Sequence, residues 1–151
     1  MWLWQSEPSR GGHEHILIEL DIESKVLEAL EDVAIVNEAG HHFGRPFMTA
    51  YQLALKLDRA HPEVKEQLGR EIGGTGSGHS LAQYLAHQLS QRIKRQGDAY
   101  PVEGAFLSND AVAALVYLGP GDRELKSSLT GSGLDVSMYR RRRESPPVDN
   151  G

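Results

Sequence analysis

The chain has 151 residues, of which 39% are hydrophobic and 25% are charged, with a formal net charge of −5. This length fits one modest core with tails, and the lack of cysteine excludes disulfides and thiolate zinc sites. No apolar run reaches the roughly 18 residues needed to span a bilayer. The opening residues also lack signal-peptide character. We therefore expect a cytoplasmic protein without membrane association.

The charge is unevenly distributed along the chain. Residues 1–40 hold nine carboxylates and two cations, whereas residues 41–100 hold eight cations and five carboxylates. A net negative protein repels nucleic acid as a whole, but a basic middle can still approach it. The acidic front and the basic middle could equally attract each other between subunits.

The first part of the chain reads as an irregular leader, a strand and a helix. Residues 1–13 form the leader, and its Trp2 and Trp4 could dock on a partner. Alternating apolar residues over 16–22 predict a short strand, with a helix as the alternative, and a helical stripe starts at residue 24. Beyond that helix, Ile35 and Val36 could extend an apolar contact to a partner or a second copy.

Three helices are then predicted, over 49–60, 62–72 and 80–95. Thr49 with Gln52, and Ser80 with Gln83, have the spacing of capping boxes at two helix starts. The third helix contains no carboxylate. Its apolar side should pack on a core, while its other side carries hydrogen-bond donors, aromatic groups and cations. The residues that we assign there to nucleic-acid binding are Ser80, Gln83, Tyr84, His87, Gln91, Arg92, Lys94 and Arg95.

A glycine-rich loop precedes this helix and is a candidate anion site. Backbone N–H groups at a helix N-terminus attract phosphate, so the predicted loop residues are Gly74, Thr75, Gly76, Ser77, Gly78 and His79. A plain linker between helices is the alternative. The loop also approaches the phosphate-loop pattern of nucleotide hydrolases, but His79 stands where that pattern requires lysine. We therefore disfavour a nucleotide hydrolase.

After Gly97 the pattern changes. Residues 99–107 predict extended structure around a turn at Glu103-Gly104, in the position of a wing, and 111–118 suit a buried helix more than a strand. Residues 119–151 read as a flexible tail. Its run Arg140, Arg141, Arg142 and Arg143 could bind phosphate or an acidic partner.

Together these features predict a mainly α fold, α+β with a minor sheet. The order of the helices resembles a helix-turn-helix or winged-helix domain, with one globular domain over 14–118 and disordered tails. The leading functional hypothesis is a small DNA-binding regulator that reads bases with helix 80–95. The alternative is a protein-interaction or oligomerising adaptor without catalytic activity. Because no catalytic triad, carboxylate pair or metal triad stands out, we expect no enzyme activity, cofactor or metal.

Overall fold

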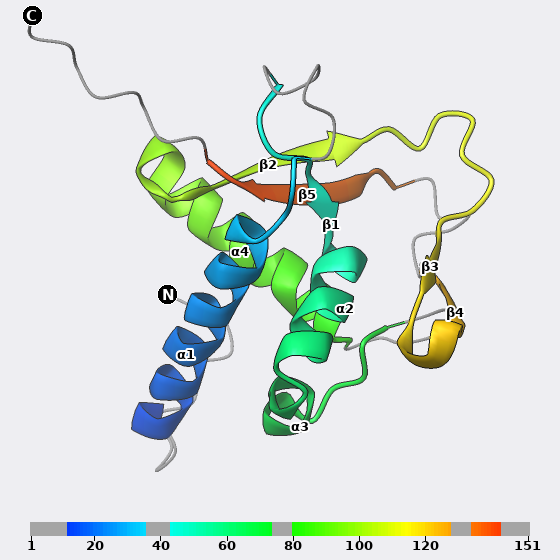
Figure 1. Ribbon diagram of the computed structural model, residues 1–151. Coiled ribbons are helices and arrows are strands. Elements are labelled where there is room, and N and C mark those ends of the chain that lie inside the picture. Colours follow the sequence, from blue (N-terminus) through cyan, green and yellow to red (C-terminus); the bar gives the residue numbers. More distant parts are fainter. Residues whose placement is uncertain (1–11, 36–42, 74–79, 128–133, 143–151) are drawn as a thin grey trace, which may run out of the picture.

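The computed structural model describes residues 12–35, 43–73, 80–127 and 134–142. Four α-helices, five strands and two short 3₁₀ helices are assigned within them (Figure 1). The elements are α1 (Gly12–Glu31), β1 (Met48–Thr49), α2 (Ala50–Ala60), α3 (Glu63–Leu68), α4 (Leu81–Gln96), η3 (Gly97–Ala99), β2 (Val102–Leu107), β3 (Val116–Leu118), η4 (Pro120–Asp122), β4 (Glu124–Lys126) and β5 (Val136–Arg141).

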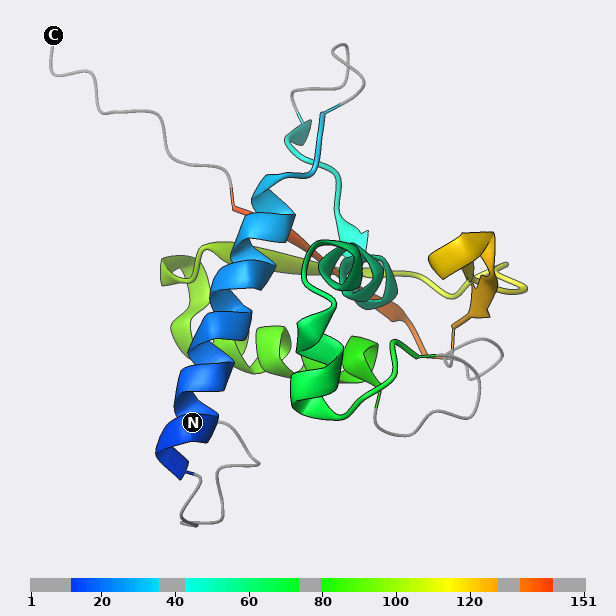
Figure 2. The same ribbon diagram turned by 60° about the horizontal axis from the view of Figure 1, so that its bottom comes forward.

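The strands form two antiparallel sheets. One has the order β1-β5-β2, and the other is the hairpin of β3 and β4. Helices α1, α2 and α4 cover one face of the three-stranded sheet, and the hairpin stands beside α2 (Figures 1 and 2). Tyr117 of β3 stacks on Tyr51 of α2, with ring centroids 5.3 Å apart, which fastens the hairpin to the helical layer.

This architecture corrects the predicted fold class. Over the residues that the structure describes, the fold is α+β with two sheets, and not mainly α. Strands β4 and β5 and the turn η4 lie in the segment that the sequence assigned to the tail. Strand β5 is in fact the middle strand of its sheet, since it pairs with both β1 and β2.

The predicted turn at Glu103-Gly104 is also wrong, because β2 pairs with β5 without interruption from Val102 to Leu107. A Cβ at Gly104 would lie 3.4 Å from Ile93 Cδ1 of α4. The glycine therefore allows the helix to approach the strand closely. The predicted buried helix over 111–118 is replaced by the three-residue strand β3, whose Val116 and Leu118 are exposed.

The N-terminal prediction needs a similar correction, since the expected strand 16–22 and the following helix are one helix, α1. Its buried apolar residues in the described part are Ile22, Val26, Ala29 and Leu30, at the spacing of one helical face, and Glu19 is buried on the same side. An ion pair between Lys25 and Asp21, one turn apart, supports the exposed side.

Both predicted helix starts are confirmed in position. Thr49 and Gln52 form the full capping box at α2. At α4 the Gln83 backbone N–H donates to Ser80 Oγ at 3.1 Å. The predicted helix 62–72 is shorter, because Gly69 adopts a left-handed conformation and ends α3 at Leu68.

Candidate functional site

Helix α4, the predicted recognition helix, divides the predicted residues between two sides. Gln83, Lys94 and Arg95 are exposed, and His87 and Gln91 are half-buried. In contrast, Ser80 is 1% exposed and Tyr84 is 5% exposed. Arg92 forms an ion pair with Glu23 of α1. The exposed stripe is therefore narrower than the sequence predicts.

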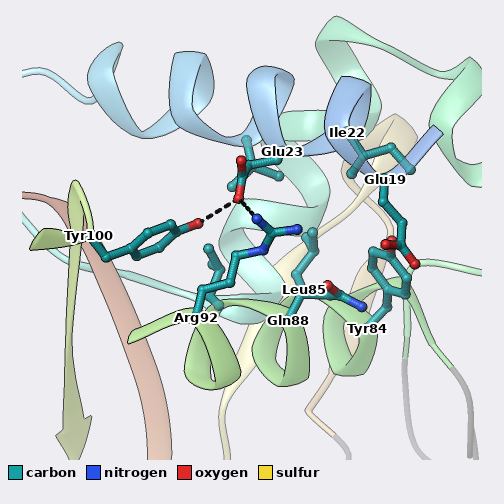
Figure 3. A pocket seen from close by; sticks show the side chains of 10 residues that line it. Glu19, Ile22, Glu23, Tyr84, Leu85, Gln88, Arg92 and Tyr100 are labelled. Carbon is teal, nitrogen blue, oxygen red and sulfur yellow. Dashed lines mark hydrogen bonds and ion pairs between the residues drawn. The ribbon is translucent and has the colours of Figure 1, made fainter. Parts of the chain in front are cut away.

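The buried side of α4 faces α1 across a small cleft (Figure 3). Glu23 is at its centre, because both Arg92 Nη1 and the Tyr100 hydroxyl reach the same oxygen, Glu23 Oε2, the hydroxyl at 3.1 Å. The cleft encloses about 270 Å³ including its open side, which is below the roughly 300–1,000 Å³ of most small-molecule sites. It is lined by Glu19, Ile22, Glu23, Val26, Tyr84, Leu85, Gln88, Leu89, Arg92 and Tyr100.

Two tyrosines in this cleft are held in their neutral form. Burial raises the pKa of Tyr84, and the negative charge of Glu19 raises it further. Burial and the nearby Glu23 raise the pKa of Tyr100 in the same way. At neutral pH both phenols are hydrogen-bond donors and not nucleophiles.

Gln88 is the unusual member of the cleft. It is 5% exposed, and neither its Oε1 nor its Nε2 finds a hydrogen-bond partner among the residues that the structure describes. Part of the 270 Å³ is open solvent, and the interior space that a water molecule can occupy holds only about one of them. The cleft is therefore too small to be a substrate site, but its polar lining affects stability.

The N-terminus of α4 was the expected anion site. Loop residues Gly74 to His79 lie outside the described residues, so that prediction stays open. The first backbone N–H groups of α4 form hydrogen bonds within the protein. Leu81 N donates to Glu71 O at 2.7 Å and Ala82 N to Ile72 O at 3.0 Å, and Gln83 N donates to Ser80 Oγ. Three of the N–H groups that usually attract an anion are therefore occupied by the chain.

The arginine run was predicted as an electrostatic tail, and the structure places its first members in β5 and just after it. Arg140 binds Glu103 Oε1 at 2.5 Å and the carbonyl of Phe43, and its guanidinium lies 4.3 Å from the Phe47 ring centroid. Arg142 binds the carbonyl of Tyr100 at 3.0 Å. Arg141 points to the other side, as alternation along a strand requires. Arg143 lies outside the described residues.

The outer edge of β2 was not predicted from the sequence, because the predicted turn at Glu103-Gly104 would divide this strand in two. Gly104, Ala105, Phe106 and Leu107 are all exposed, and Phe106 is 73% exposed. The neighbouring loop is joined to the start of β5 by the Asn109 N–H, which donates to Asp135 Oδ1 at 2.9 Å. Large exposed apolar side chains therefore occur both at the end of the strand and in the segments that follow it and precede β5, namely Phe106, Leu107, Val112 and Leu134.

The remaining predicted residues give less information. Ile35 is 44% exposed, while Trp2, Trp4 and Val36 lie outside the described residues. Within the described ranges no group of three or more acidic, histidine or cysteine side chains could hold a metal ion. Nor does any described helix have the length and apolar character needed to cross a bilayer.

Comparison with protein-family models, with curated proteins and with solved structures finds no match to this chain.

Proposed function

We propose that this protein is a protein-interaction module, of the oligomerising or adaptor kind and without catalytic activity, that binds its partner at the outer edge of β2. The observation that carries this proposal is the edge strand Val102–Leu107, whose last four residues are exposed, with large exposed apolar side chains at and beyond its end. An unpaired strand edge is a template for another strand. Contiguous exposed apolar groups are typical of interaction sites.

The electrostatics agree with this choice over DNA binding. Two cations of the basic segment 41–100 form ion pairs with carboxylates of segment 1–40. Arg92 pairs with Glu23, and Lys56 pairs with Asp32 at 3.3 Å. The acidic front therefore neutralises part of the basic middle inside one molecule, and less positive charge remains for phosphate.

The proposal is tested by charging the apolar end of β2. Phe106→Asp should weaken binding of a partner by roughly tenfold or more, because an exposed aromatic group is a frequent hot spot. Ala113→Asp, in the exposed loop, is the matched control. The partner is identified from a pull-down by mass spectrometry, purified, and titrated against both variants by calorimetry. The proposal fails if the wild type is monomeric in light scattering and no purified partner distinguishes the two variants.

DNA binding remains a second candidate because of one observation on α4. Gln83, His87, Gln91 and Lys94 follow one another on the same exposed or half-buried stripe of a helix without carboxylates. Fluorescence anisotropy with mixed DNA fragments at low salt tests it. Lys94→Ala should reduce the salt slope by about one unit if the stripe meets phosphate. No binding at low salt rejects this candidate.

A further inference from the structure

The backbone groups at the outer edge of β2 can be assigned residue by residue. Arg142 N donates to Pro101 O at 2.7 Å, so Pro101 and Arg142 are a hydrogen-bonded pair of the β2–β5 ladder. Bonded and non-bonded pairs alternate along an antiparallel ladder. Residues 103, 105 and 107 therefore bond to β5, and Val102, Gly104 and Phe106 direct their N–H and C=O groups outward.

This edge lacks the usual protection against strand pairing. Natural edges are guarded by lysine, proline or a bulge, yet β2 contains neither residue, and its register with β5 has no bulge. Its only charged residue, Glu103, forms ion pairs through its carboxylate with Arg140 Nε at 2.5 Å and Arg142 Nη1 at 3.4 Å. The edge is therefore close to electrically neutral, and two copies of it would not repel each other.

The strand can also pair with itself about a two-fold axis. Directly opposed residues must both direct their backbone groups outward or both direct them toward β5, so the axis passes through a residue and not between two. The residues nearest the middle of β2 are Gly104 and Ala105. With the axis at Gly104, Phe106 of each copy would face Val102, which is 0% exposed and therefore inaccessible. With the axis at Ala105, each Phe106 faces the other copy's Gly104, which is exposed and has no side chain, and lies beside Ile93, which approaches that glycine from α4.

We propose that the partner at this edge is a second copy of the chain. This inference rests on the proposed function and names its partner. Strand β2 pairs antiparallel with β2 of the second copy, with the two-fold axis at Ala105, and two three-stranded sheets become one of six strands. Phe106 supplies the apolar contact, Leu107 of each copy lies opposite Glu103 of the other, and Gly104 and Phe106 exchange backbone hydrogen bonds across the axis.

The test uses the absence of cysteine in the chain. In the proposed register the two Ala105 residues are a non-hydrogen-bonded pair with Cα atoms about 4.5 Å apart, within the range that a disulfide spans. Ala105→Cys should therefore form a disulfide-linked dimer under mild oxidation. Ala113→Cys, which is also exposed but lies in the loop, should remain largely monomeric.

Light scattering across a wide concentration range gives a second measurement. The wild type should dimerise as concentration rises, and Ala105→Lys should be monomeric because it opposes two lysines at the axis. Ala113→Lys should behave as the wild type, and equal melting temperatures show that the exposed substitutions leave the fold intact. A wild-type dimer that persists in Ala105→Lys, with no Ala105→Cys cross-link, overturns the proposal.

The outcomes also separate this inference from the proposed function. A wild type that is monomeric at every concentration, but binds a different purified protein in a Phe106-dependent manner, overturns self-pairing and leaves the interaction module standing. If there is neither a dimer nor a Phe106-dependent partner, both proposals are wrong.

Discussion

At the scale of single residues, Gln88 has a buried amide with both a donor and an acceptor unpaired among the described residues. A buried polar group without a partner costs about 1–3 kcal/mol. Gln88→Met, which keeps the shape and removes the amide, should therefore raise the free energy of unfolding by about that amount. Urea denaturation measures it, with the exposed Gln83→Met as control. A loss of stability in Gln88→Met would mean that a bound molecule forms hydrogen bonds with the Gln88 amide.

The two cleft tyrosines predict the alkaline behaviour. Their pKa values are raised above 10.0 by burial and by neighbouring carboxylates. In the unfolded chain they ionise near pH 10, so their contribution to stability is complete below about pH 10 and is lost as pH rises beyond it. Stability should fall between about pH 10 and pH 12, and less steeply in Tyr84→Phe. Equal slopes in urea titrations of the two proteins would contradict this assignment.

At the scale of elements, Arg140 joins segment 43–47 to the sheet. Its guanidinium reaches Glu103 and the carbonyl of Phe43 and stacks on Phe47. Arg140→Ala should cost about 1–3 kcal/mol, because it removes charge-assisted bonds from partly buried groups. Arg141→Ala should cost less, because these contacts with Glu103, Phe43 and Phe47 are made by Arg140 and not by Arg141. Thermal unfolding compares them, and equal losses would show that the run acts only as positive charge.

The start of α4 provides a second test at this scale. Ser80 is 1% exposed and accepts the Gln83 amide. Ser80→Ala should destabilise the protein by about 0.5–2 kcal/mol, while Ser80→Asp should retain much of the cap. Thermal melts of the two variants measure the difference. If both variants melt like the wild type, the bonds to the carbonyls of Glu71 and Ile72 hold the helix end without the cap.

The elements that the sequence predicted well are those with local signals. The pairs Thr49-Gln52 and Ser80-Gln83 locate the starts of α2 and α4, since a capping bond joins residues three apart. Strand β5 has no such signal. Its partner strands, residues 48–49 and 102–107, are far away in sequence. Without knowledge of that pairing, the arginines of β5 are typical of a solvated tail, whereas in the fold Arg140 forms an ion pair with Glu103. The wrong turn at Gly104 has the same cause. A glycine is typical of a turn, and the sequence alone does not show that Ile93 of α4 packs against this one.

The candidate site was predicted only in part. The spacing of Gln83, His87, Gln91 and Lys94 identified one exposed stripe on α4, but the same periodicity could not show that α1 covers Tyr84 and pairs with Arg92. No local sequence pattern predicts the exposed edge of β2. Which side of a strand is free depends on strand order, and that order is set by β5.

At the scale of the whole molecule, the chain encloses its core on one face of the three-stranded sheet and leaves one long strand at the edge. The opposite edge strand, β1, has only two residues, Met48 and Thr49. It offers little template for pairing, whereas β2 offers six residues. Association should therefore be confined to one edge and stop at a dimer, without growth into fibres.

The measurement that tests this account most directly is backbone hydrogen exchange along β2 at low and high protein concentration. The amides of Glu103, Ala105 and Leu107 bond to β5, so they should be protected at both concentrations. The amides of Gly104 and Phe106 point outward and should exchange rapidly in the dilute protein and slowly in the concentrated protein. Exchange at Gly104 and Phe106 that does not change with concentration would contradict pairing at this edge.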